Sequence, residues 1–86
     1  MVTPEDIKST IESALACEHV EVVGDGRHFQ AVVVSGAFAG ISKVKQHQLV
    51  FRTLGDRMRE EVHALSMQTL TPAEWAQRRM IGAAPG

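Results

Sequence analysis

The sequence predicts an α+β domain in which helices cover a three-stranded mixed sheet, with the element order helix, strand, strand, helix, strand, helix. Three observations lead to this fold class. Two segments begin with a threonine, a proline and acidic residues, which is how many helices start. Two runs of β-branched residues flank an Asp-Gly pair, which is typical of a hairpin. A long helical pattern then separates this hairpin from a third alternating run, so the third strand can pair in parallel.

The first helix is expected to begin after Thr3 as N-cap, with Pro4 at its first helical position. Acidic residues in its first turn complement the helix dipole. The helix should end near Cys17. Its predicted core-facing stripe consists of Ile7, Ile11, Ala14 and Leu15.

A hairpin follows, in which residues 20–23 and 29–34 pair antiparallel around Asp25 and Gly26. Asp-Gly is favoured here because a tight hairpin turn requires positive φ angles. The second run is almost continuously apolar, which is typical of a central strand.

The second helix is expected to be capped by Ser42. Gly55 interrupts its pattern, so one long helix and two shorter helices both remain open. The apolar stripe predicted for this helix consists of Val44, His47, Phe51, Leu54 and Met58.

The third strand is predicted over residues 62–69. Thr71 and Glu74 then form a capping box with Pro72 at the first helical position, and the last helix runs to about Met80. Trp75, on this helix, is expected to anchor the core. Residues 81–86 are expected to form a flexible tail of a single domain that spans residues 1–86.

Length, charge and cysteine content exclude several classes of protein. Eighty-six residues supply the interior for one core. The net charge of −1 offers no overall attraction to nucleic acid, so such binding would need a local patch. Cys17 is the single cysteine, which rules out an internal disulfide and a thiolate metal cage. Neither a signal peptide nor an apolar run of about 20 residues is present, so a cytoplasmic protein that does not enter membranes is expected.

The sequence gives no support to an enzyme, and no catalytic residues are assigned. It has no glycine-flanked nucleophile, no HExxH pattern and no phosphate-binding glycine loop. Three of the four histidines have ordinary structural explanations: His19 at a helix end, His28 as a solvated strand end, and His47 as a partly buried ring hydrogen-bonded to backbone. His63 lies at the entrance of the third strand, on the side of the apolar residues that follow. A structural role and a ligand role are equally open for it.

Basic residues gather in the middle of the chain and in the last helix: Lys43, Lys45, Arg52, Arg57, Arg59, Arg78 and Arg79. Neighbouring acidic residues dilute this patch, so a solvated helix surface is its default explanation. The order of elements also occurs in KH-type nucleic-acid binders, but the GXXG loop that clamps the backbone is absent, because "GAFAG" has a different spacing.

The segments "HFQAVVVSGAFAGISKVKQHQLVF" and "VHALSMQTLTPAEW" resemble the BolA family. The turn "GDGRHF", with "SKVK" and "TPAEWAQRR", is most similar to the IbaG (YrbA) branch. The resemblance extends from the first helix to Arg79. It rests on Phe38 and Gly40, on His47 seven residues after that glycine, and on the "VHAL" and "TPAEW" motifs.

This resemblance implies a class II KH-like fold and a role as partner of monothiol CGFS glutaredoxins in iron–sulfur cluster handling. In such complexes a [2Fe-2S] cluster bridges the two proteins, with the glutaredoxin cysteine and glutathione on one side. His63 matches the family's "VHAL" histidine, which is a cluster ligand. The chain is expected to bind no cluster by itself and to be a monomer or weak homodimer.

Two departures from the family pattern bear on this transfer. The family's second ligand is a cysteine or histidine in the loop between the first two strands, where this chain offers His28 as the nearest imidazole and Asp25 as an oxygen donor. Many members also have an arginine where this chain has Gln46. Some members are linked to DNA binding under stress, so the alternative function is a KH-like transcriptional regulator with DNA as partner.

Overall fold

The predicted order of elements is confirmed. The computed structural model describes residues 2–25, 27–61 and 64–82, with the backbone alone for residues 56–61, 64 and 80–82. Along the chain lie α1 (Pro4–Ala14), β1 (His19–Gly24), β2 (His28–Val34), the 3₁₀ turn η1 (Gly36–Phe38), α2 (Lys43–Glu61), β3 (Ala64–Leu70) and α3 (Pro72–Gly82).

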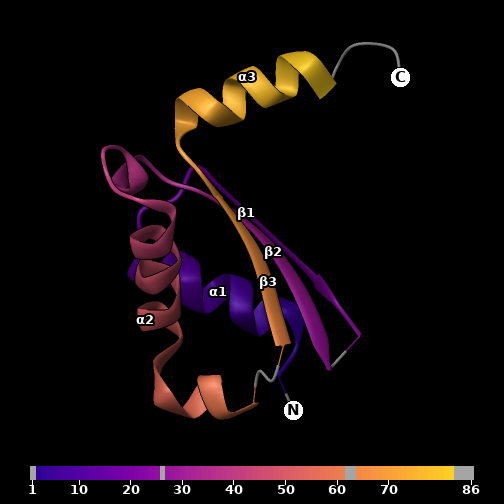
Figure 1. The fold of residues 1–86 in the computed structure, drawn as a ribbon. Coiled ribbons are helices and arrows are strands. Elements are labelled where there is room, and N and C mark those ends of the chain that lie inside the picture. Colours follow the sequence, from indigo (N-terminus) through magenta and orange to yellow (C-terminus); the bar gives the residue numbers. More distant parts are fainter. Residues whose placement is uncertain (1, 26, 62–63, 83–86) are drawn as a thin grey trace.

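The sheet has the strand order β1-β2-β3, with β1 antiparallel and β3 parallel to the central strand β2. The prediction of a mixed sheet with the second strand at its centre is therefore confirmed. Figure 1 shows α1 and α2 on the same face of this sheet, whereas α3 extends from the end of β3 away from the body of the domain. No helix in the described ranges is both long enough and apolar enough to cross a bilayer.

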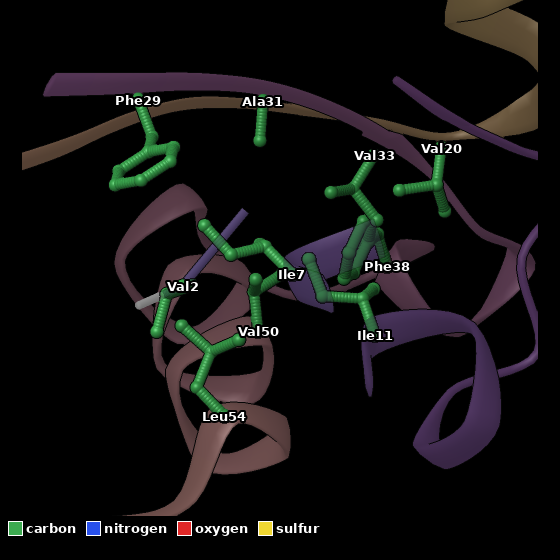
Figure 2. Close-up of a cluster of buried hydrophobic side chains, with 10 residues drawn as sticks. All are labelled: Val2, Ile7, Ile11, Val20, Phe29, Ala31, Val33, Phe38, Val50 and Leu54. Carbon is green, nitrogen blue, oxygen red and sulfur yellow. The ribbon is translucent and has the colours of Figure 1, made fainter. Parts of the chain in front are cut away.

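The hydrophobic core lies between the covered face of the sheet and the two helices, as Figure 2 shows. Removing these side chains from water is the main force that holds the layers together, at about 1.5–3 kcal/mol for each large one. The core residues are Val2, Ile7, Ile11, Val20, Phe29, Ala31, Val33, Phe38, Val50 and Leu54.

The local signals at the helix starts are confirmed. Thr3 Oγ1 accepts the backbone N–H of Asp6 at 3.1 Å, and the Asp6 carboxylate accepts the backbone N–H of Thr3 at 3.0 Å. Thr71 and Glu74 make the same reciprocal pair, at 3.2 and 2.8 Å. Each such cap satisfies backbone donors that have no partner within the helix, and typically contributes about 1 kcal/mol.

The end of the first helix differs from the prediction. Leu15 takes an extended conformation and its N–H still bonds to Ile11, so α1 ends at Ala14 and not near Cys17. Ala14, expected in the core-facing stripe, is exposed in this last turn, while Leu15 is half-buried.

The predicted apolar stripe of the second helix is wrong for two of its members. Val44 is 67% exposed and Phe51 is 38% exposed. The buried side of α2 instead carries Gln46, Val50 and Leu54, which recur every four residues. The pattern misled because Gln46 is polar yet only 4% exposed. The side chain of Met58, also in that stripe, lies outside the description.

Gln46 is buried because its amide links three parts of the fold. Its Nε2 donates to the carbonyl oxygens of Phe38 at 3.1 Å and Ile41 at 3.0 Å. Its Oε1 accepts the hydroxyl of Thr69 on β3 at 2.7 Å. A buried amide with all these partners joins η1, the loop before α2 and the edge strand β3.

The break at Gly55 settles the choice between one helix and two. Gly55 has φ 70° and ψ 168°, so α2 consists of two helical segments that meet at this residue. Only glycine reaches this conformation without strain. The second segment leads toward the start of β3 (Figure 1).

Trp75 is not a core residue. Its half-buried indole stacks on His19, with ring centroids 4.8 Å apart and planes 16° from parallel, and Arg79 lies 6.0 Å from the ring centroid. The prediction failed because α3 extends beyond the sheet and does not lie on it. α3 continues past Met80 to Gly82.

Candidate functional site at the hairpin end of the sheet

The hairpin turn and the start of β3 lie at the same end of the sheet. His28, the first residue of β2, is in register with Ala64, the first residue of β3. Neighbouring strands lie about 4.8 Å apart, so the chain enters both strands side by side. His63 directly precedes Ala64 in the sequence but lies outside the described residues. Its ligand role therefore stays a prediction.

The side chain of His28 is exposed, as expected for a strand-end residue. Phe29, which follows it, is buried in the core, and the alternation of the strand directs His28 to the uncovered side. On β3, Leu65, Met67 and Thr69 are more buried than the residues between them. This confirms the side of β3 that the sequence assigned to the core.

The carboxylate of Asp25 organises the turn that leads to His28. Its Oδ1 accepts the backbone N–H groups of Arg27 and His28, both at 2.9 Å. Hydrogen bonds from the His28 and Arg27 backbone hold the pKa of the Asp25 carboxyl below its usual 3.8. One of the two oxygens that Asp25 would offer to a metal is thus already used to hold the turn. The φ angle of Gly26 lies outside the description.

Gly24, opposite Phe29 in the ladder, is a site-forming residue that the sequence reasoning missed. A Cβ atom here would lie 2.5 Å from Phe29 Cδ1 and 2.6 Å from the His28 carbonyl oxygen. Glycine therefore allows the close approach that places His28 at the strand entrance. A glycine directly before Asp-Gly was the available signal.

Cys17, another possible metal ligand, lies far from the hairpin turn. Cys17 is in the connection between α1 and β1, two residues before His19, which pairs with Val34 at the opposite end of β2 from His28. Burial, and then the Glu12 carboxylate, raise the pKa of the Cys17 thiol above its usual 9.0. A protonated thiol is a poor metal ligand, so both position and chemistry separate Cys17 from this site.

His19 and His47 have roles other than those expected from the sequence. His19 does not cap α1. It opens β1, stacks on Trp75 and lies 3.5 Å from the Glu21 carboxylate. His47 is half-buried as expected and lines a shallow pocket with Met67, but its ring makes no hydrogen bond to any described residue.

Most of the predicted basic patch is engaged within the fold or lies outside the description. Lys43 donates to the Thr69 carbonyl and pairs with Glu74 at 3.7 Å. Arg78 donates to Gln68. The side chains of Arg57 and Arg59 are not described, which leaves two exposed cations on the first segment of α2, Lys45 and Arg52.

Within residues 2–25, 27–61 and 64–82, no group of three or more histidine, cysteine or acidic side chains comes together as a metal site. Among the described residues, the donors at the hairpin end are few: the imidazole of His28 and the partly engaged carboxylate of Asp25. Such a set suits a metal centre that a second molecule completes.

Comparisons with known proteins agree with this fold. Residues 2–74 match the family model for BolA-like proteins. The chain is 40% identical over 77 residues to the acid stress protein IbaG of Escherichia coli, which covers 88% of this chain and 92% of that protein. It is 40% identical over 74 residues to the DNA-binding transcriptional regulator BolA of Vibrio cholerae, a match that covers 86% of this chain and 67% of that protein. The solved structure of a BolA homologue from Coxiella burnetii superimposes with a TM-score of 0.79 at 44% identity, and the match covers 88% of this chain and 99% of that one.

Proposed function

Because the chain belongs to the BolA family, we propose that it acts as a non-enzymatic adaptor that shares a [2Fe-2S] cluster with a monothiol CGFS glutaredoxin. The observation that carries this proposal is the register of His28 with Ala64, the residue after His63. It supports the proposal because His28 lies beside the residue that follows His63 in the sequence. One glutaredoxin cysteine and glutathione would supply the remaining ligands.

The donors fit this group. Imidazole replaces thiolate on one iron of some [2Fe-2S] centres and raises their reduction potential. When bound, the cluster would supply the redox or transfer chemistry, and the chain would hold and orient it. The Asp25 turn fixes the backbone of His28, and Gly24 permits the close packing of that strand end. A ligand at the start of an ordered strand, as His28 would be, is placed more accurately than a ligand on a loop.

The decisive experiment is cluster assembly with the glutaredoxin, followed by visible circular dichroism, for His63→Ala and His28→Ala. His63→Ala should abolish the spectrum of the mixed complex or convert it to that of a glutaredoxin homodimer. His28→Ala should weaken assembly if His28 is the second ligand.

His19→Ala and Cys17→Ser are the matched controls, because both lie at the other end of the sheet. A wild-type spectrum from the His63→Ala complex would remove the ligand assignment. A wild-type spectrum from His28→Ala alone would move the second ligand to another residue. Loss of the spectrum in Cys17→Ser would contradict the exclusion of the thiol.

A DNA-binding regulator is the second candidate, because the Vibrio cholerae relative bears that name and Lys45 and Arg52 are exposed. The burial of Gln46 argues against phosphate contact at that helix position. A titration with duplex DNA across salt concentrations separates the two functions. Nanomolar affinity with a steep salt dependence would favour the regulator.

A further inference from the structure

The outer side of α2 forms a groove with the segment around η1. The groove has a volume of about 410 Å³ and is lined by Ala37, Ile41, Lys45, Gln48, Leu49 and Arg52. Ile41 and Leu49 are half-buried and form an apolar floor. Lys45 and Arg52 are exposed and, being seven residues apart, lie on the same side of the helix about 10 Å from each other along its axis.

The rim of this groove is positively charged by Lys45 and Arg52. The six residues that line the groove include two cations, Lys45 and Arg52, and no acidic residue. The ion pairs found among the described side chains involve His19 and Lys43, and none involves a groove residue. The rim is therefore complementary to carboxylates on another molecule.

Two exposed apolar side chains extend the surface along the same helix. Val44 precedes Lys45, and Phe51 precedes Arg52, at 67% and 38% exposure. Because consecutive helical residues point about 100° apart, Val44 and Phe51 form a side of α2 next to the side of Lys45 and Arg52, where they add apolar contact area for another protein. Phosphate contacts in nucleic-acid complexes are made by basic and polar groups, and the exposed valine adds nothing to such contacts.

We infer that this groove docks an acidic segment of a partner protein, with apolar side chains against Ile41 and Leu49 and carboxylates at Lys45 and Arg52. A second copy of this chain fits poorly, because pairing through the same face would bring two cationic rims together. The inference rests on the proposed function, in which the partner is the glutaredoxin.

The groove and the hairpin end of the sheet are separate surfaces. The groove is lined by residues around η1 and on the first segment of α2, whereas His28 begins β2 directly after the hairpin turn. Docking at the groove should therefore occur without a cluster, and groove variants should affect the cluster-free complex that ligand variants leave intact.

The test is the affinity of the cluster-free glutaredoxin for the full chain, measured by calorimetry at low and high salt. Arg52→Glu and Lys45→Glu should each weaken this complex by roughly five- to thirtyfold, since each loses an attraction and gains a repulsion. Lys8→Glu, the same charge change at an exposed position of α1, should change it by less than about twofold. The wild-type complex should weaken as salt rises.

A matched pair of variants tests the apolar part of the docking surface. Val44→Asp should weaken the cluster-free complex, whereas Val23→Asp, at a valine that is 54% exposed on β1, should not. Thermal midpoints of all variants establish that they are folded.

The possible results separate the docking surface from the function. If the groove variants bind like Lys8→Glu while the wild type binds well, the docking surface is wrong and the proposed function stands. If the wild type binds the glutaredoxin neither with nor without a cluster, both are overturned. If the groove variants lose duplex DNA and keep the glutaredoxin, the groove is a nucleic-acid surface and the docking inference is overturned.

Discussion

Replacing Gln46 by leucine should destabilise the domain far more than expected for a polar residue of a helix. Leucine has similar bulk but cannot donate to the carbonyl of Ile41 or accept from the hydroxyl of Thr69. The carbonyl of Phe38 keeps a long bond from the Ile41 N–H at 3.4 Å, so two groups lose their partner.

Each buried polar group left without a partner costs about 1–3 kcal/mol, which gives about 2–6 kcal/mol for the two. A small domain has about 5–15 kcal/mol of stability in total. The midpoint of thermal unfolding should therefore fall by at least about 8 °C.

Urea unfolding followed by far-ultraviolet circular dichroism measures this loss. Gln48→Leu, an exposed glutamine on the same helix, is the control and should stay within about 0.5 kcal/mol of the wild type. A Gln46→Leu protein as stable as Gln48→Leu would refute the role of the amide. Adding Thr69→Val to Gln46→Leu should cost less than Thr69→Val alone, because the hydroxyl has already lost its acceptor.

Three further outcomes follow from the structure. Trp75→Ala should lower the free energy of unfolding by only about 1–2 kcal/mol, below the 3–5 kcal/mol of a fully buried ring, because its indole is half-buried. A larger loss of thermal stability would place Trp75 in the core. Asp25→Asn should make stability depend less on pH below about pH 5. A carboxyl whose pKa is lowered in the folded protein stabilises the fold at pH values above its usual pKa of 3.8, and this contribution disappears as the pH falls through the folded-state pKa. Equal urea midpoints for the two proteins at every pH would contradict this. Cys17 should react with a disulfide reagent at neutral pH more slowly in the folded protein than in urea, because its thiol is half-buried with a raised pKa, and equal rates would contradict this.

The elements that the sequence predicted well are those set by local chemistry. Thr3 and Thr71 cap their helices through residues three positions away. The hairpin forms around Asp25 as predicted, but Asp25 acts through its carboxylate and not through a positive φ angle. Such signals need no knowledge of the rest of the fold. The parallel third strand was also predictable, because a helical crossover leaves few alternatives.

The errors concern residues whose environment is decided by distant parts of the chain. Gln46 is buried because three groups remote in sequence or on other elements bond to it, and an apolar pattern has no means of showing this. Val44 and Phe51 are then turned outward. Trp75 was assigned to the core because its helix is well capped, but capping does not determine where a helix lies. Of the candidate site, the structure places His28 and leaves the position of His63 as a prediction from the sequence.

The two ladders of the sheet close over very different lengths of chain. β1 and β2 meet across a short turn, whereas β3 must return to β2 after η1 and the whole of α2. The entropy cost of loop closure therefore favours a folding order in which the hairpin forms early and β3 joins last. His28 then acquires its neighbour at Ala64 only in the final step. Amide hydrogen exchange should be faster in β3, an edge strand, than in β2. Detachment of that one strand would remove the neighbour of His28 while the hairpin stays folded, which would give the proposed shared cluster a route of release.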